Sequence, residues 1–395
     1  MTMRTAIPDG AAAGVEREPV PPGASASRGR RILAIATNPE TGASTRFRVL
    51  QWRPDLQRAG FTLSLHAFFS SAAAEVLYQP GRHALKLAHG GAGFIRRVIA
   101  LHRAACTADL LFVHRETFPL GLKCSFRTLK RFPGPLIYDY DDAMFLPQRQ
   151  GRGLLSRLED LETPREIMAI SDLVLAGNGM LAEYARRYAR RVVLLPTCID
   201  TERFRPRHAE TPAAPGGRLT VGWIGSHSTT KYLQSLQPVL QVLARDTGCR
   251  FYAVGGSEAL QLHGVEAQYA RWSLDREVED FLRCDVGVYP LWNDPWAQGK
   301  CGFKAIQFMA CGIPVVASAV GVNREIIQDG INGFLAETEE EWVEKLHYLL
   351  TDAALRRRMG EAGRTTVETR YSLRANAPVL LSALSQAMEK SGTLP

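Results

Sequence analysis

The sequence predicts an α/β protein with two domains, each built on a doubly wound parallel β-sheet. Its 395 residues, 46% of them hydrophobic, are enough to cover two cores. Short apolar runs typical of buried strands alternate with helix-like stretches, which favours parallel sheets. This alternation pauses once, between Glu202 and Arg218, where Pro, Ala and Gly dominate, and then resumes. Because ligands of such sheets bind at the carboxyl ends of the strands, we expect the domains to face each other across a cleft that holds the site.

The first domain is predicted to span residues 30–205, after a tail at 1–29. The tail is rich in Ala, Pro and Gly without periodicity, which is typical of a flexible segment. The run RRILAIATN predicts a buried strand, ETGAST a turn, and RFRVLQWRPDLQRAG one helix that ends near Gly60. Further strands are predicted at DLLFVH (109–114), PLIYDY (135–140) and DLVLAG (172–177), each followed by a helical stretch.

The second domain is predicted to span residues 219–374, after a linker at 206–218. Strands are predicted at LTVGWIGS, CRFYAVGG, DVGVYPL and IPVVASAV. Leucines at 233, 236, 240 and 243 recur at helical spacing and predict a helix that starts near Lys231. Another helix is predicted from about Phe303 to Cys311, because Gly312 and Pro314 follow it.

The positive charge of the chain is concentrated in its first half. The net charge is +8, and residues 30–210 contain 27 Lys/Arg and 17 Asp/Glu, against 18 and 20 in residues 211–395. Much of this charge lies in helix-like stretches such as GFIRRVIALHRAA (93–105). Such stretches fit either a solvated helix face or attraction to an anionic membrane or substrate. Nucleic acid is not favoured as a partner, because no recognisable nucleic-acid-binding motif accompanies the charge.

Cysteine usage and hydropathy bear on the cell compartment. The seven cysteines are odd in number, scattered and without C-x-x-C spacing, which is typical of a reducing cytoplasm. No apolar run reaches the roughly 18 residues of a membrane-spanning helix, and residues 1–29 lack the apolar core of a signal peptide. We therefore expect a cytoplasmic protein, with peripheral contact at the inner face of the membrane as a further option.

Two predicted helix starts in the second domain have the features of a phosphate site. In VGWIGSHSTTKY a strand ends at Gly225, and a loop of small hydroxyl residues leads to the helix at Lys231. In PWAQGKCGFKAI a glycine turn leads to the other helix, with Lys300 and Lys304 beside its start. Free backbone N–H groups at two helix starts, together with three lysines, suit a diphosphate. The alternative is that the Ser and Thr side chains only cap their helix.

These segments resemble a known family of enzymes. The stretch from Gly299 to Glu325, with the run FMACGIPVVASAVGVNREII (308–327), is similar to the donor-binding segment of family 4 (group 1) retaining glycosyltransferases of GT-B fold. Their pattern is E-x7-E-A-M-A-x-G-x-P-V-V-A-S followed by G-x-x-E-I. DLLFVH resembles the family's strand ending in His, VVLLPTCIDTERFRP its P-N-G-V-D-x-x-x-F link, and RYSLRANAPVLLSALSQAM its closing helix. The resemblance covers nearly all of the chain after residue 30. It implies the GT-B fold, with a C-terminal helix at 375–392 that returns to the first domain.

The resemblance also implies a reaction. A sugar would move from a nucleotide-diphosphate donor to an acceptor hydroxyl, with its anomeric configuration retained. The product would belong to a cell-surface polysaccharide, a glycolipid or a specialised glycoconjugate, and the acceptor would be a sugar, a lipid-linked sugar or a small molecule. No metal and no cofactor are implied, because lysines and helix ends take the place of a cation.

The sequence departs from the family pattern at the donor site. Gly299 and Gln307 stand where the family has its two glutamates, and Ser226 stands where it has an arginine. Gln307 still offers hydrogen bonds, and we expect Asp294 to supply a carboxylate and a nearby lysine to supply the lost charge. The predicted donor-binding residues are Gly225, Ser226, His227, Lys231, Asp294, Lys300, Gly302, Phe303, Lys304 and Gln307.

The run GPLIYDYDDAMF carries three carboxylates, Asp139, Asp141 and Asp142. They fit a metal site, a phosphatase nucleophile or neither. A metal site is disfavoured because both phosphate-type helix starts lie in the other domain, and the further motifs of a phosphatase are not apparent. Strand alternation sends Asp139 and Asp141 to one face and Asp142 to the other, so not all three converge. We predict that Asp141, or failing that Asp142, bonds the acceptor hydroxyl or the developing sugar cation.

Three more side chains complete the predicted site in the first domain. His114 ends the DLLFVH strand, where the resemblance places a residue that touches the donor sugar. Arg46 and Arg48 follow the first glycine turn and are predicted to steer an anionic acceptor, unless surface salt bridges explain them. The predicted catalytic residues are Asp141, Asp142, His114, Lys231 and Lys304; the predicted acceptor-binding residues are Arg46, Arg48, His114 and Asp141; no metal ligand is predicted.

Two other function classes remain open. A non-hydrolysing sugar-nucleotide epimerase has the same two-domain architecture, but it needs carboxylates and a histidine placed for proton abstraction. A product assay without acceptor would reveal it. A non-catalytic sugar-nucleotide-binding subunit would bind the donor without turning it over.

Overall fold

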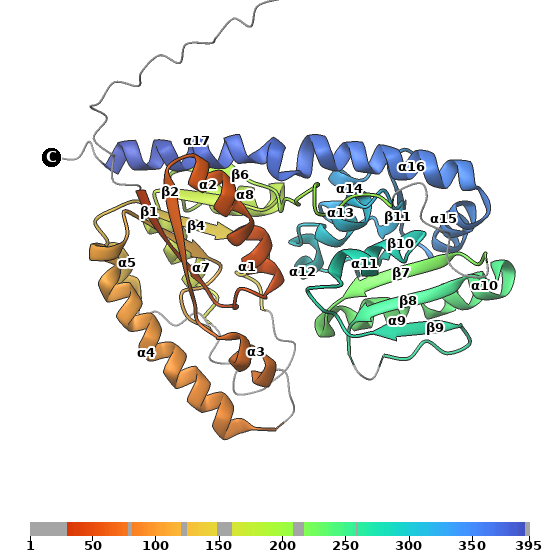
Figure 1. The fold of residues 1–395 in the computed structure, drawn as a ribbon, viewed down its shortest axis with the longest axis horizontal. Coiled ribbons are helices and arrows are strands. Elements are labelled where there is room, and N and C mark those ends of the chain that lie inside the picture. The colour runs from red at the N-terminus through yellow and green to blue at the C-terminus, as the bar shows by residue number, and fades with distance from the viewer. Residues whose placement is uncertain are drawn as a thin grey trace, which may run out of the picture.

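The computed structural model describes residues 30–77, 81–119, 125–147, 160–207, 217–257 and 260–391. Within these residues the chain forms two six-stranded sheets, and all strand pairs are parallel. Figure 1 shows the two domains side by side, with two long C-terminal helices running along both. The predicted two-domain α/β fold is therefore confirmed. The tail predicted at 1–29 and most of the predicted linker lie outside the described residues.

The first sheet has the strand order β2-β1-β3-β4-β5-β6. Its strands are β1 (Arg30–Ala36), β2 (Phe61–Ala67), β3 (Leu110–His114), β4 (Leu136–Tyr140), β5 (Leu173–Ala176) and β6 (Val192–Leu194). Strands β3 and β4 pair so that His114 lies beside Asp139. Both faces of the sheet are buried. Ile32 and Ile35 of β1 point to opposite faces and pack in two different hydrophobic cores.

The helices of the first domain differ from expectation in one place. They are α1 (Ala43–Arg48), α2 (Arg53–Arg58), α3 (Ser71–Leu77), α4 (His83–Thr107), α5 (Phe126–Lys130), α7 (Thr163–Ile170) and α8 (Gly179–Arg186). The single helix predicted before Gly60 is wrong: the chain forms α1, a 3₁₀ turn and α2. Val49 leaves the helical region, and Pro54 sits in the first turn of α2, where its missing N–H does no harm.

The second sheet has the strand order β12-β11-β10-β7-β8-β9. Its strands are β7 (Thr220–Gly225), β8 (Arg250–Gly255), β9 (Ala267–Ala270), β10 (Val286–Tyr289), β11 (Val315–Ser318) and β12 (Phe334–Ala336). Its helices are α9 (Thr230–Ser235), α10 (Gln237–Thr247), α11 (Glu277–Leu282), α12 (Pro295–Gln298), α13 (Phe303–Ala310), α14 (Asn323–Ile326), α15 (Glu339–Thr351) and α16 (Ala353–Thr366).

The two helices predicted in the second domain are both present. The leucine stripe at 233, 236, 240 and 243 is buried, and α9 begins next to Lys231 as predicted. The helical stretch is divided into α9 and α10, because Pro238 in the first turn of α10 cannot continue the helix before it. Helix α13 covers Phe303–Ala310 and is followed by Gly312, whose φ of +68° places it in the left-handed region.

The last helix, α17 (Leu373–Ser391), returns to the first domain. Leu380 and Leu384 of α17 share a core with Ile32 and Trp52 of the first domain. The chain crosses between the domains twice, and the crossings are bonded to each other: Ile199 N–H donates to Tyr371 O at 2.8 Å. The implied closing helix is therefore present.

Candidate active site

The carboxyl ends of the two sheets meet through direct contacts. Asn178, just after β5, donates from its side-chain nitrogen to the carbonyls of Gly299 and Lys300, both at 3.0 Å. The Cys301 thiol donates to the carbonyl of Asp141 at 3.1 Å. The turn that begins α13 in the second domain is thus held against the predicted catalytic residues of the first. Sequence position gave no sign of this, because the bonded residues are more than 100 positions apart.

Asp139 is a buried structural carboxylate. Its Oδ1 accepts from Arg48 Nη2, and its Oδ2 accepts from Arg48 Nε at 3.2 Å. Arg48 also donates to the carbonyl of Leu195 at 2.7 Å, so it joins three elements of the first domain. Burial alone would lower the pKa of Arg48, but the charge of Asp139 raises it above its ordinary value. The prediction that Arg48 meets an acceptor is wrong, because its side chain is 1% exposed and fully engaged.

His114 is held by Asp139 and presents its other ring nitrogen to Asp141. Its Nδ1 lies 2.7 Å from Asp139 Oδ2, which makes Nδ1 the protonated nitrogen when the ring is neutral. Its Nε2 is buried without a hydrogen-bond partner and lies 4.0 Å from Asp141 Oδ1. A buried imidazole nitrogen that lacks a partner can accept a hydrogen bond from a ligand.

Arg115 binds both carboxylates that follow β4. Its Nε donates to Asp141 Oδ1 and its Nη2 to Asp142 Oδ2, both at 2.6 Å. The strand ends at Tyr140, so alternation no longer separates Asp141 from Asp142, while Asp139 stays apart with Arg48. The expectation that the three carboxylates do not all converge agrees with this arrangement, but the expected grouping of Asp139 with Asp141 is wrong, because Asp141 and Asp142 share Arg115. Arg115 itself was missed by the sequence analysis.

The backbone and the charges around Arg115 are unusual. Its φ of +63° is left-handed, which costs a residue with a side chain about 1–2 kcal/mol. Burial would raise the pKa of Asp141, but the charges of Arg115 and Arg48 hold it well below its ordinary value. Asp141 is therefore charged at neutral pH. The signal that could have found Arg115 was its place directly after a strand-end histidine in the neighbouring strand.

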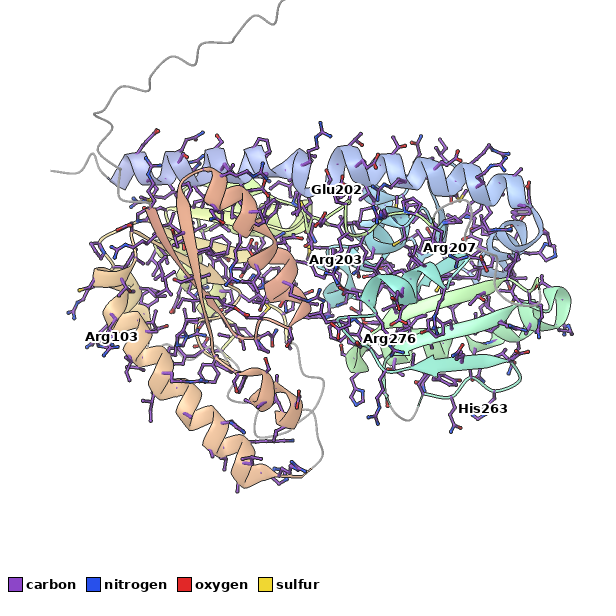
Figure 2. The ribbon with its side chains drawn as sticks, viewed as in Figure 1. Arg103, Glu202, Arg203, Arg207, His263 and Arg276 are labelled. Carbon is purple, nitrogen blue, oxygen red and sulfur yellow. The ribbon has the colours of Figure 1, made fainter. Side chains whose placement is uncertain are left out.

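Arg46 crosses to the second domain. Its two terminal nitrogens bind the two oxygens of Glu277 in α11 at 2.8 and 2.9 Å, and the side chains are 10% and 2% exposed. Arg203, labelled in Figure 2 where the domains meet, binds the same carboxylate at 3.0 Å. Burial would raise the pKa of Glu277, but the bonds from Arg46 lower it. The structure thus gives Arg46 an interdomain ion pair in place of the predicted acceptor contact.

The loop after β7 is held by its own side chains. Ser226 begins a 3₁₀ turn and bonds reciprocally with Thr229 in a capping box. His227 Nδ1 lies 2.9 Å from the carbonyl of Gly256, and the side chain is exposed. Lys231 Nζ lies 4.7 Å from the ring centre of Trp292 and 5.1 Å from that of Tyr232. The Ser and Thr side chains of the loop therefore cap their turn, the phosphate site at this helix start stays a prediction, and Lys231 rests on two aromatic rings.

The start of α13 brings Lys304 and Gln307 together. Gly302 precedes the helix with a φ of +63°, and Phe303 packs on Phe47 of the first domain with ring centres 4.3 Å apart. Lys304 Nζ donates to Gln307 Oε1 at 2.8 Å. Gln307 is fully buried, and its Nε2 has no hydrogen-bond partner. Burial lowers the pKa of Lys304 to about 8, although Glu277 opposes this.

Two predicted donor residues, Asp294 and Lys300, and the nearby Gly299 have contacts of their own. Asp294 accepts from the backbone N–H of Ala297 at 2.7 Å and so caps α12. Lys300 Nζ lies 5.6 Å from the ring centre of Trp296. Gly299 packs tightly on the first domain, since a Cβ there would lie 2.5 Å from Ala143 Cβ. A side chain at position 299 would therefore collide in this domain arrangement.

A separate cavity of about 450 Å³ lies beside α14 and α16. Arg324, Asn332, Thr366 and Arg370 are among its lining residues. None of the predicted site residues lines it. Among the residues that the structure describes, no group of three His, Cys, Asp or Glu side chains is arranged to hold a metal ion.

Comparison with known proteins supports the resemblance over part of the chain. Residues 218–352 match the model of the family "Glycosyl transferases group 1". A D-inositol 3-phosphate glycosyltransferase of Stackebrandtia nassauensis is 34% identical over 119 residues, which are 30% of this chain and 26% of that protein. The corresponding protein of Segniliparus rotundus is 24% identical over 268 residues, 60% of this chain and 57% of that one. The chain thus spans about a quarter to rather more than half of these relatives.

Solved structures share the fold over about nine-tenths of the chain. Sucrose-phosphate synthase from Thermosynechococcus elongatus has a TM-score of 0.67 at 17% identity, covering 91% of this chain and all of that one. Anabaena HepE, solved with UDP and glucose, has a TM-score of 0.65 at 15% identity, covering 90% of this chain and all of that one. The chain therefore has the GT-B fold, and its second domain matches the group 1 glycosyltransferases.

Proposed function

We propose that the protein is a glycosyltransferase that moves a sugar from a nucleotide-diphosphate donor to an acceptor hydroxyl, with retention of configuration. The observation that carries this proposal is the contact between Cys301 and Asp141, which joins the start of α13 to the carboxylates after β4. In this proposal the helix start that binds the donor phosphates and the carboxylates that face the acceptor form one site. HepE of Anabaena has been solved with UDP-glucose, which supports the nucleotide-sugar class of donor.

The donor side consists of Lys231, Lys304 and the backbone amides around Gly225, Gly302 and Phe303. The slow part of the reaction separates a cation-like sugar from a diphosphate, so groups that stabilise the leaving diphosphate accelerate it. Lys304 is protonated at neutral pH, and a bound diphosphate would raise its pKa further. The free Nε2 of Gln307 donates to a ribose or sugar hydroxyl, which replaces one bond of the missing glutamate.

The acceptor side consists of His114, Asp141 and Asp142. Asp141 accepts a hydrogen bond from the attacking hydroxyl or stabilises the developing sugar cation. The unpartnered Nε2 of His114 accepts from a donor-sugar hydroxyl. Arg115 is a positioning residue, because it holds both carboxylates in one orientation. We further propose that the reaction is that of the family 4 glycosyltransferases. The acceptor would then come from the synthesis of a cell-surface polysaccharide, a glycolipid or a glycoconjugate.

A thermal-shift screen tests the donor class. UDP, GDP, ADP and their sugars are added separately, and one nucleotide family is expected to raise Tm, because a ligand that binds the folded state stabilises it. Incubation of that donor sugar with candidate acceptors, followed by NMR of the product's anomeric proton, then tests transfer and retention. No shift with any nucleotide would contradict the proposed donor site. Epimer formation without acceptor would show the epimerase instead, and binding without turnover would show a non-catalytic subunit.

Chelation is expected to leave transfer activity unchanged. Asp139, Asp141 and Asp142 each bind an arginine, and these cations occupy carboxylate oxygens that a metal would need. The measurement is the initial rate with and without EDTA, with added Mn²⁺ or Mg²⁺ as the control. Loss of activity in EDTA that either ion restores would make the Asp141–Asp142 pair a metal site.

A further inference from the structure

Helix α4 is fixed to the first domain mainly through one face, with a further bond from Arg96 Nη2 to the carbonyl of Phe68 at 3.0 Å. Arg97 donates from Nη2 to the carbonyls of Ala36 and His66 at 2.6 and 3.1 Å, at the carboxyl ends of β1 and β2. Gly93 lies against Phe68, where a Cβ would come within 2.8 Å of the Phe68 carbonyl. Gly93, Arg97, Leu101 and Ala104 are the buried residues of this helix. The rotation of α4 about its axis is therefore determined.

The opposite face of α4 carries a regular apolar stripe. Leu85, Ile95 and Ile99 are 41%, 61% and 47% exposed. The full outer stripe, apolar except for His102 and at alternating spacings of three and four, is Leu85, Ala88, Ala92, Ile95, Ile99, His102 and Cys106, and all seven are exposed. This spacing places them on one side of a helix, facing away from the core. Figure 1 shows α4 along the outer edge of the first domain, with its first turns projecting beyond the sheet.

The charge along this helix has one sign. Residues 76–108 contain five Lys/Arg and no Asp or Glu. Arg96 and Arg103 are exposed on one border of the stripe, together with the partly buried His89. Arg103 is labelled on the outer side of α4 in Figure 2. No helix in the described part of the chain is long and apolar enough to cross a membrane.

We propose that the outer face of α4 docks on an anionic lipid membrane. Isoleucine and leucine side chains enter the interface between headgroups and acyl chains, and the arginines beside them bind lipid phosphates. A second copy of the chain fits this face less well. Packing two stripes together brings the basic borders of both helices near each other, and no acidic residue on α4 is there to pair with them.

The position of α4 gives the contact a use. The bonds from Arg97 to Ala36 and His66 place the middle of the helix at the carboxyl edge of the first sheet, the edge that also carries His114. Docking would hold this edge near the bilayer, so a lipid-linked acceptor could reach the site without leaving the membrane. That use rests on the proposed function, whereas membrane binding itself does not.

Vesicle co-sedimentation tests the proposal. The full chain is mixed with phosphatidylcholine vesicles that either contain or lack phosphatidylglycerol. Binding is expected only with phosphatidylglycerol, and it should fall as salt rises, because charges are screened over about 10 Å at 0.1 M. Ile95→Ser/Ile99→Ser and Arg96→Glu/Arg103→Glu should each lower the partition coefficient at least about tenfold. The matched control is Arg357→Glu/Arg358→Glu, an equal charge change at exposed positions on α16, which should bind nearly as the unchanged chain does.

Each contrary outcome overturns the proposal. Absence of binding, or equal binding to both vesicle types, removes the anionic membrane as partner. Equal weakening by the α16 control shows a general charge effect instead of docking through α4. A dimer in sedimentation velocity that Ile95→Ser/Ile99→Ser abolishes assigns the stripe to a second copy. Circular dichroism and the UDP, GDP and ADP thermal shifts are recorded for every variant, so that a failed fold or a failed donor site is recognised separately.

Discussion

Replacing Asp141 by Asn is expected to lower kcat/KM for sugar transfer by about 10²–10⁴-fold while leaving affinity for the donor nucleotide unchanged. The substitution keeps the shape of the side chain but removes the charge that faces the acceptor hydroxyl or the sugar cation. The fold should tolerate it, because Arg115 keeps Asp142 as a partner and no buried charge is left alone. Initial rates give the loss of transfer, and thermal shifts with the nucleotide give its affinity.

Two matched variants separate the role of Asp141 from simple structural damage. Asp142→Asn makes the same chemical change on the other carboxylate that Arg115 binds, and it should cost less. Arg115→Lys keeps the charge but cannot bind both carboxylates through two nitrogens of a planar fork, so it should lower kcat more than it changes nucleotide affinity. If Asp142→Asn abolishes transfer and Asp141→Asn does not, the two roles are exchanged. Full activity in both would exclude this carboxylate pair from the chemistry.

Replacing Lys304 by Met is expected to lower kcat and kcat/KM together, by about 10²–10³-fold. Met preserves much of the apolar stem but removes the ammonium group that stabilises the leaving diphosphate. Glu277 keeps Arg46 and Arg203 as partners, so the loss of this cation does not leave a buried carboxylate unpaired. Lys231→Ala should also lower the rate of transfer while leaving Tm nearly unchanged. If both variants fold and their kinetics are unchanged, the diphosphate does not bind at these two helix starts.

The pH profile provides a second test of Lys304. Its pKa is lowered to about 8, so the free protein loses this charge as pH rises through about 8, and donor binding should weaken there. Lys304→Arg stays charged over this range, so it should abolish that alkaline step even if the overall rate falls. The free energy of unfolding is expected to change in the opposite direction, increasing with pH. Because the pKa of Lys304 is about 8 in the folded chain and about 10.5 in the unfolded chain, burying its charge destabilises the fold below pH 8, and this destabilisation disappears as pH rises towards 10.5.

Local patterns were sufficient for the central strands of both sheets and for the predicted helix starts, but they missed the four edge strands, β2, β6, β9 and β12. The strands at 109–114, 135–140 and 172–177 were found from apolar runs, because a strand buried on both faces has few polar residues. The leucine stripe from Leu233 to Leu243 predicted one helix from its spacing, and the structure divides that stretch into α9 and α10. The helix before Gly60 was predicted as one piece because its apolar spacing continues through a point where Val49 leaves the helical region.

Pairings between distant residues could not be predicted from one sequence. Arg46 and Glu277 are 231 positions apart, and Arg48 and Asp139 are 91 apart, so no spacing rule connects them. Both arginines were predicted at a ligand because they follow a glycine turn, where exposed charges are common. Arg115 was missed because its role depends on the order of β3 and β4 in the sheet, which fixes what lies beside a strand end.

The return of α17 to the first domain has a consequence for the order in which the protein can fold. The second domain is a single continuous stretch, from the first chain crossing at Ile199 to the second at Tyr371. The first domain is not, since Leu380 and Leu384 of α17 cover Ile32 and Trp52. During synthesis the second domain is therefore complete while one side of the first domain's core still awaits α17. Of the two domains, the one that starts first is finished second.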